Sequence, residues 1–353
     1  MSGSVLQALA AKDAFKPVAR FDLLANEHVR LLELGAADVD DMLGRAIAKG
    51  SGVITVVGTS GSGKSSLIAY TAEHLPSDFV PIRISVSAAT DAFASVPTFC
   101  RHCVDWLARM RFQELSEREH RAVERHVTPV ESAVSTARTR GVTASLGVPI
   151  KALKTKVEAN LSTQAGEQLK YVDQGGDAAD ALVKTLDVFT SLTPKRLPVL
   201  LIEDTDHWAS TPGVADAFFD TVVRHLAKGA GIDAVVVCSA QPSYTALDGY
   251  KDIRGVLGAE IFMPVLPKPI EGLSALLQSR MTADLDDSCG VRDAFSESAL
   301  TALAKTYEVD VDIRRTLNVA HSALGQAAGD GSAAILQGHI QHGMAQHPPR
   351  TSP

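Results

Sequence analysis

A glycine-rich segment, GTSGSGKS from Gly58 to Ser65, has the spacing G-x-x-x-x-G-K-[ST] of a phosphate-binding loop. Glycines let the backbone wrap closely around a phosphate, because they adopt positive φ angles at little cost. Backbone N–H groups and the N-terminus of the helix that follows favour the anion. We expect Lys64 to reach the β- and γ-phosphates of a nucleotide, and Ser65 to bind Mg²⁺. The residues expected to contact ATP are Gly58, Thr59, Ser60, Gly61, Ser62, Gly63, Lys64, Ser65 and Ser66.

Carboxylates follow an apolar run further along the chain, in the segment VLLIEDTD at residues 199–206. An apolar strand that ends in acids supplies what an ATPase requires, since one acid holds the Mg²⁺ shell and another orients water. The residues alone leave two assignments open. Either Glu203 acts on the metal and Asp204 on water, or Asp204 acts on the metal with Asp206 or Glu203 as the base.

With these two motifs the chain resembles the AAA+ P-loop ATPases, especially their origin-recognition and initiator-like branch and related bacterial mobile-element or defence ATPases. The resemblance covers about residues 22–112 and 176–345. Two further segments stand in the family's order: a strand VVVCSAQ at 235–241, and VDIRRTL at 311–317 in a helical region.

The resemblance implies three more roles. Ser239 or Gln241 matches a polar sensor at the end of a strand. Arg314 matches an arginine that reaches the γ-phosphate from a helical lid, with Arg315 as its neighbour. Arg254 matches an arginine finger that acts on the nucleotide of an adjacent subunit. The chain departs from the family in reading Glu-Asp where Asp-Glu is usual, and in lacking Asn at the sensor position.

Apolar periodicity around these motifs predicts an α/β fold with a parallel five-stranded sheet between helices and a helical C-terminal region. The resemblance implies that these form a P-loop AAA+ core and a C-terminal helical lid. Strands are expected at 53–57, 79–86, 197–202, 234–238 and 260–263. Helices are expected at 22–49, 98–112, 178–192, 214–228, 270–281, 296–307, 313–326 and 333–342. The expected domains are an N-terminal arm at 1–21, a nucleotide-binding core at 22–267, a lid at 268–346 and a disordered tail at 347–353.

An insertion at 113–175 separates the phosphate loop from the acidic strand, and its pattern predicts a helix and a β-hairpin. Residues 101–156 contain 11 Lys and Arg against 6 Asp and Glu, whereas the whole chain contains 34 against 41. A basic segment on an acidic protein could contact nucleic-acid phosphates or an acidic protein, or could simply be a solvated surface. Aromatic residues are missing between Phe112 and Tyr171, which argues against base stacking.

The composition excludes several classes of protein. A formal net charge of −7 excludes a uniformly basic nucleic-acid coat, and 45% hydrophobic residues exclude global disorder. Four cysteines in 353 residues do not make a disulfide scaffold, which favours a reducing, cytoplasmic location. Since no apolar run approaches 18 residues, we expect no membrane span.

These observations predict a homo-oligomeric ATPase that binds and hydrolyses ATP with Mg²⁺. Its output would be assembly or conformational change, through recruitment or loading on DNA or control of an associated effector. The alternative is a slowly or non-hydrolysing nucleotide switch of signalling or defence type that acts on a protein partner. The Glu-Asp order favours that alternative.

Overall fold

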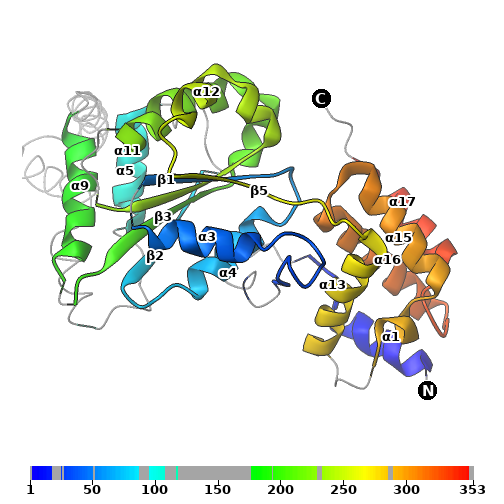
Figure 1. Cartoon of the computed structure of the whole chain (residues 1–353). Coiled ribbons are helices and arrows are strands. Elements are labelled where there is room, and N and C mark those ends of the chain that lie inside the picture. The colour runs from blue at the N-terminus through cyan, green and yellow to red at the C-terminus, as the bar shows by residue number, and fades with distance from the viewer. Residues whose placement is uncertain are drawn as a thin grey trace, which may run out of the picture.

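The structure is a computed structural model of the chain, drawn in Figure 1. It describes residues 2–17, 25, 28–50, 52–86, 95–107, 117, 176–192, 194–228, 233–284 and 289–349. The predicted insertion at 113–175, with its helix and hairpin and with Lys151, Lys154 and Lys156, lies outside the described residues apart from residue 117.

A five-stranded parallel sheet forms the centre of the larger lobe, in the order β2-β3-β4-β1-β5. The strands are β1 (Gly52–Val57), β2 (Phe79–Ser85), β3 (Leu197–Glu203), β4 (Val235–Ala240) and β5 (Ala259–Phe262). All pairs are parallel, with Ser85 opposite Glu203 and Val57 opposite Ala240. The carboxyl ends of the strands therefore meet at one edge, where open α/β sheets place their ligands. The prediction of five parallel strands is confirmed.

Apolar cores cover both faces of this sheet, because neighbouring side chains in a strand point to opposite sides. Ile54 and Val56 of β1 share a core with α3 (Val39–Ala48) and α4 (Lys64–Glu73). Val53 and Val57 share the other core with helices that include α5 (Val96–Leu107) and α12 (Asp248–Arg254), which lie above the sheet in Figure 1. The helix α9 (Gly176–Thr190) and the π-helix η3 (Phe218–Val223) also contribute to this core. Shorter helices are η2 (Thr205–Ser210), α10 (Pro212–Ala217), α11 (Arg224–Lys228) and η4 (Pro242–Ala246).

The C-terminal part of the chain is a separate helical lobe, as predicted for the lid (Figure 1). Its helices are α13 (Pro269–Asp284), α14 (Val291–Ala294), α15 (Glu297–Asp310), α16 (Ile313–Gly329) and α17 (Gln337–Gln346). The N-terminal helix α1 (Ser2–Ala11) packs against α14 and α16, with Leu6 and Leu9 buried. The N-terminal segment therefore contributes to the core of the lid, although the larger lobe separates the two in the sequence.

The helix predicted over 22–49 is wrong for more than half of its described residues, since only Val39–Ala48 is helical among them. Turns occupy 31–35 and end at Gly35, which has a φ of +76°. Asp38 then begins α3 by accepting a hydrogen bond from the backbone N–H of Asp41. Val29, Leu31 and Leu34 do not form one face of a helix but line a pocket between the two lobes.

The remaining strands and helices agree with their predicted positions within a few residues. His347, the first residue of the predicted tail, is held by a hydrogen bond from Arg315 to its carbonyl. Within the described part of the chain, no helix combines the length and the apolar character needed to cross a bilayer.

Candidate nucleotide-binding site

The phosphate loop lies between β1 and α4, at the carboxyl edge of the sheet. Gly61 and Gly63 have φ angles of +78° and +97°, a backbone conformation that favours glycine. The Lys64 side chain is only 5% exposed, and its amino group donates to the carbonyls of Gly58 and Thr59 at 2.7 and 2.9 Å. The loop is thus folded around its own lysine.

Asp206 faces Lys64 from η2, just beyond the acidic strand. Its carboxylate oxygens lie 3.1 and 3.3 Å from the lysine nitrogen. Burial lowers the pKa of Lys64, and Asp206 opposes this effect, while the positive charge of Arg314 adds to it. A phosphate that approaches Lys64 must therefore compete with a carboxylate that is already there. The sequence suggested Asp206 only as a base, and gave no sign of this ion pair.

Glu203 is fully buried at the end of β3. Burial raises its pKa to about 7, which Asp204 reinforces and Arg83 and Ser65 oppose. Nε of Arg83, on the neighbouring strand β2, donates to Oε2 of Glu203 at 3.0 Å. Among the described residues no hydrogen bond reaches Oε1 of Glu203. A buried carboxylate oxygen beside the Ser65 hydroxyl is a donor set of the kind that Mg²⁺ prefers, so these residues fit the ion.

Asp204 occupies a different position from its neighbour. Its carboxylate is about one third exposed, accepts a hydrogen bond from Ser85 Oγ and lies 3.7 Å from the Arg83 guanidinium. Its φ of +66° is unusual for a residue other than glycine and turns the chain sharply after β3. The two acids therefore point to different surroundings, with Glu203 toward Ser65 and Asp204 toward Ser85.

Ser239, a predicted sensor residue, is not among the residues that line the pocket beside Lys64. It is buried at the end of β4, where its Oγ is 3.3 Å from Oγ1 of Thr205 and 3.4 Å from the carbonyl of Ile202. Thr205 in turn donates to the carbonyl of Ser239 at 2.8 Å. These bonds connect β4 to the turn that carries the acids. Gln241, the other sensor candidate, is half-buried just after the strand.

The lid contacts the phosphate loop directly. The backbone N–H of Arg314 donates to the carbonyl of Gly61 at 3.3 Å, and the Arg314 side chain is exposed and lines the same pocket as Lys64. Asp312 is buried against Gly61 so closely that a Cβ at Gly61 would overlap its carboxylate. Glycine is therefore needed at position 61 for two reasons: the φ angle is positive, and a Cβ would obstruct the approach of the lid.

Arg315 is buried among residues of the lid, whereas Arg314 is exposed. Arg315 donates to the carbonyls of His347 and Thr306 and to the carboxylate of Asp310 at 2.9, 3.2 and 3.1 Å. The two adjacent arginines thus divide between the pocket and the interior of the lid.

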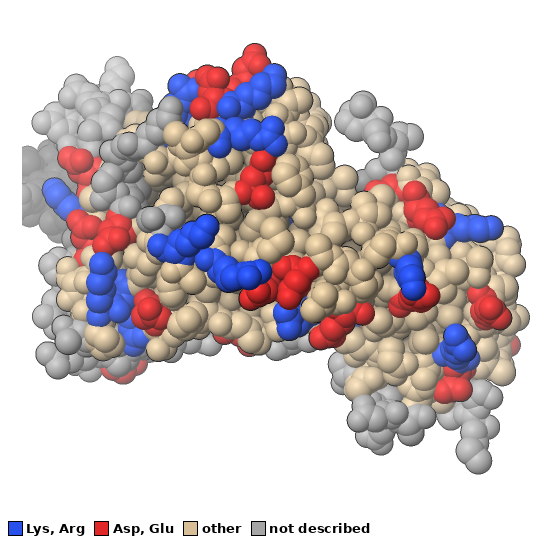
Figure 2. Space-filling view, viewed as in Figure 1, with Lys and Arg blue, Asp and Glu red and all other residues tan. Residues whose placement is uncertain are grey.

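Arg254 lies away from the pocket, at the end of α12. Its side chain is exposed, and Nε and one terminal nitrogen donate to Oε2 of Glu260 at 2.9 and 2.7 Å. The other oxygen of Glu260 accepts from Tyr250, whose hydroxyl also meets Thr55 of β1 at 2.9 Å. Over α12 the basic residues alternate with acids and form no single-sign patch on the face shown in Figure 2.

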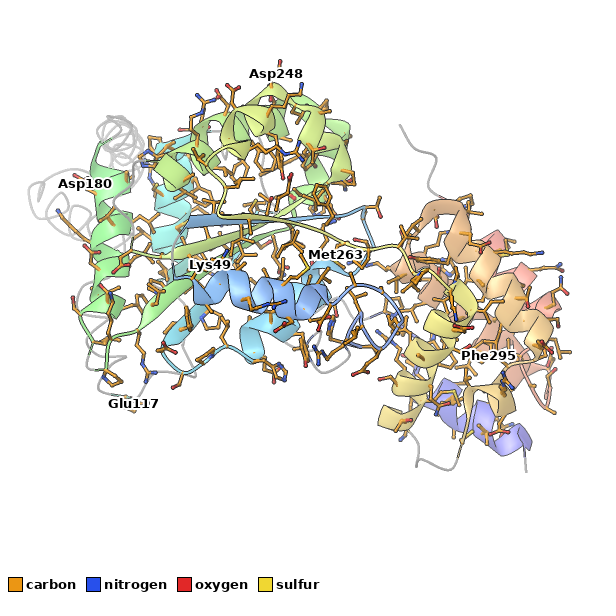
Figure 3. All side chains as sticks on the ribbon, viewed as in Figure 1. Lys49, Glu117, Asp180, Asp248, Met263 and Phe295 are labelled. Carbon is orange, nitrogen blue, oxygen red and sulfur yellow. The ribbon has the colours of Figure 1, made fainter. Side chains whose placement is uncertain are left out.

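The pocket between the lobes continues from the phosphate loop into an apolar region. Its wall combines side chains from the segment before α3, from the connection to the lid and from the lid itself. They are Val29, Leu31, Leu34, Met263, Leu276, Ile313 and Leu317, with the polar residues His28 and Arg280. Figure 3 shows Met263 at the junction of the two lobes. Such a wall suits a flat base, and sequence reasoning missed it by assigning residues 22–49 to one helix.

Comparisons with known proteins agree with this fold. Residues 36–221, more than half of the chain, match the family of the AAA ATPase domain. The search of curated proteins gave no match.

Solved structures with a similar fold include ORC proteins and a Cdc6 protein. The ORC1 protein of Aeropyrum pernix in complex with DNA is 13% identical, with a TM-score of 0.50 over 90% of this chain and 65% of that one. ORC of Drosophila bound to DNA is 17% identical, with a TM-score of 0.48 over 97% and 66%. Cdc6p from Pyrobaculum aerophilum is 12% identical, with a TM-score of 0.49 over 95% and 70%. This chain spans about two thirds of the length of such structures, and at these identities the likeness concerns the fold alone.

Proposed function

Because the chain belongs to the AAA ATPase domain family, we propose that it binds ATP with Mg²⁺ between the phosphate loop and the lid, hydrolyses it and changes conformation as a result. The observation that supports this proposal best is that side chains from separate segments of the chain meet at one pocket. Lys64, Asp206 and Arg314 reach one pocket from three separate segments, and Glu203 and Ser65 meet at its edge.

Each residue has a distinct task in this proposal. Lys64 and the backbone N–H groups of residues 58–66 bind the phosphates, and Arg314 contacts the γ-phosphate from the lid. Ser65 and Glu203 would hold Mg²⁺, which neutralises charge on the phosphates. Asp204 orients the attacking water and accepts its proton. This assignment follows the surroundings of the two acids, and it selects one of the two orders that the sequence left open.

The lid makes nucleotide binding and conformation depend on each other. Arg314 and Asp312 contact Gly61, so any movement of the phosphate loop on binding ATP is transmitted to α16. A guanidinium placed by a separate lobe distinguishes ATP from ADP by its contact with the γ-phosphate.

Replacing Arg314 with alanine should weaken ATP binding about tenfold, because a charge-assisted hydrogen bond is lost, and should leave ADP binding nearly unchanged. Replacing Arg315 with alanine should instead destabilise the lid by about 3 kcal/mol, because Asp310 would remain buried without its partner. Calorimetric titration with both nucleotides and thermal unfolding of both variants separate these outcomes. Equal weakening of ATP and ADP binding in R314A would contradict the role of the arginine in sensing the γ-phosphate.

We propose that Arg254 acts on the nucleotide of an adjacent copy in a homo-oligomer, since it is exposed and outside its own pocket. R254A binds ATP but offers no finger, whereas K64A binds no ATP but keeps its finger. Each variant alone should be inactive, and mixing them should restore part of the ATPase rate. Mixtures that stay inactive although native mass spectrometry shows mixed oligomers would exclude this role, and K251A, at an exposed lysine on the same helix, serves as the control.

We further propose that the protein acts on DNA, with residues 101–156 supplying basic contacts. The origin-recognition proteins of similar fold include some solved with DNA, and this supports the choice of probe. The ATPase rate is measured with and without duplex DNA over a salt series. Stimulation that falls steeply with salt, and that is lost when Lys151, Lys154 and Lys156 are replaced by glutamine, is expected for phosphate contacts. Absence of any DNA response at low salt would favour an acidic protein as the partner.

One observation favours the alternative of a slowly hydrolysing switch. Asp206 already forms an ion pair with Lys64, and burial raises the pKa of Glu203 to about 7. Part of the charge in the site is therefore neutralised before nucleotide binds. A switch of this kind would bind ATP with high affinity but turn it over at a rate insensitive to R254A. The mixing experiment above therefore distinguishes it from an assembled ATPase.

A further inference from the structure

A largely buried chain of three side chains lies beside the nucleotide pocket, and two of them, His28 and Asp40, belong to neither sequence motif. Nε2 of His28 lies 2.5 Å from Oδ1 of Asp40, and Nδ1 of His28 lies 3.0 Å from Oγ of Ser66. The side chains of His28 and Asp40 are only 5% and 3% exposed. The three residues come from the segment before α3, from α3 and from the first turn of α4. They connect the wall of the apolar region to the phosphate loop.

The hydrogen bonds of Asp40 determine which nitrogen of His28 carries a proton. Oδ2 of Asp40 accepts from the backbone N–H of Leu31 at 3.0 Å. Burial raises the pKa of Asp40, but hydrogen bonds from His28 and Leu31 outweigh this effect and lower it below the ordinary value. Asp40 is therefore a carboxylate, and a carboxylate can only accept hydrogen bonds. Nε2 of His28 must then be the donor to Asp40.

The protonation of the other nitrogen, Nδ1, decides the direction of the Ser66 hydroxyl. When His28 is neutral, Nδ1 has a lone pair and accepts the only proton of that hydroxyl. When His28 is charged, Nδ1 donates to Ser66 Oγ and the hydroxyl proton can be directed elsewhere. His28 and Ser66 both line the pocket beside Lys64. The oxygens of an ionised phosphate only accept hydrogen bonds. Ser66 can therefore form a hydrogen bond with a phosphate only when its hydroxyl proton points toward that phosphate.

We infer that His28 is a positioning residue that couples nucleotide binding to the uptake of a proton, by turning the Ser66 hydroxyl toward a phosphate of the bound nucleotide. The inference rests on the proposed binding of ATP at this site. Asp40 holds the ring by one edge, and Tyr70 stacks on its face with ring centroids 4.6 Å apart. The ring therefore keeps its place while its charge changes.

Other groups that face this chain must be considered in any dependence on pH. From the same segment and from α3 they are Arg30 and Asp38, from α4 they are Tyr70 and His74, and around the pocket they are Lys64, Asp206, Arg280 and Arg314. These groups are unchanged in a variant of His28, as are the phosphates of ATP and Glu203. The difference between wild type and a His28 variant therefore isolates the contribution of His28.

The test measures the Kd of Mg²⁺·ATP by isothermal titration calorimetry between pH 6 and 8, in buffers of different ionisation enthalpy. In His28→Gln the amide can donate to Asp40 and accept from Ser66, which reproduces the neutral ring at every pH. We expect the wild type to lose about tenfold more affinity than this variant between pH 6 and 8, and to take up more protons on binding. Ser66→Ala should show the same weakened dependence on pH.

The matched control is His74→Gln, at the exposed outer ring of the same stack, 4.1 Å from Tyr70 between centroids. It should keep the pH dependence of the wild type. A His28→Gln protein whose ATP affinity depends on pH as in the wild type, with the same proton uptake, would overturn the inference. If His28→Gln does not fold, the same result in Ser66→Ala would overturn it. A wild-type protein that binds no ATP at any pH would instead overturn the proposed function, so the two failures are distinguishable.

Discussion

Replacing Lys64 with alanine is expected to abolish measurable ATP binding. The lysine is the buried cation of the loop, and its loss removes charge-assisted hydrogen bonds to the phosphates and leaves Asp206 unpaired in their place. Loss of one such set of bonds weakens binding by about 100-fold, and repulsion between Asp206 and the phosphates adds to it. Calorimetric titration or a fluorescent ATP analogue measures the change.

The double variant K64A/D206N separates these two contributions. Removing the carboxylate should restore part of the lost affinity, because the phosphates then meet no negative charge at this point. D206N alone should bind ATP more tightly than the wild type, since Lys64 no longer has a competing partner. If K64A binds ATP as the wild type does, the nucleotide lies elsewhere and the assignment of the site is wrong.

Replacing Asp204 with asparagine is expected to lower the hydrolysis rate by about 100-fold or more, the contribution of a general base, while ATP binding persists. Asparagine is a suitable replacement because it tolerates the positive φ that Asp204 adopts, so the turn should be retained. The rate is measured as phosphate release at saturating ATP, and the affinity by titration. Unimpaired hydrolysis in D204N would show that Asp206 or Glu203 acts on water instead.

Glu203→Gln is the matched variant one residue earlier, and it should respond differently. Its main effect should be a raised requirement for Mg²⁺, because a carboxylate ligand is lost. It should also change stability with pH. The pKa of Glu203 is raised from 4.5 to about 7 by burial, so the fold favours the protonated form. Ionisation therefore destabilises the nucleotide-free protein progressively as pH rises from about 4.5 through 7, and the loss is complete above 7.

Glutamine resembles the protonated acid, so E203Q should have a higher melting temperature than the wild type at pH 8 without nucleotide. The difference should disappear near pH 4. A melting temperature that E203Q lowers equally at both pH values would indicate that the bond between Arg83 and Glu203 matters more to the fold than the burial of charge.

The local motifs and the succession of elements were readable in the sequence. The phosphate loop, the acidic strand and the five strands of the sheet depend on residues next to one another, whose spacing and alternation carry the information. The helices of the lid were predicted from their apolar periodicity, and a role for Arg314 toward the γ-phosphate was predicted from resemblance. The break in the expected helix over 22–49 was missed because apolar residues that line a pocket between lobes can mimic a helical stripe, although Gly35 marks the turn.

The contacts that tune the site join residues far apart in the chain, and no local pattern encodes them. Arg83 reaches Glu203 only because β2 and β3 are neighbours in the sheet, and Asp206 reaches Lys64 only because η2 turns over the loop. His28, in the segment before α3, contacts Ser66 in the first turn of α4. Adjacent residues on a helix point about 100° apart, so the tertiary structure alone places Arg314 in the pocket and Arg315 in the interior of the lid.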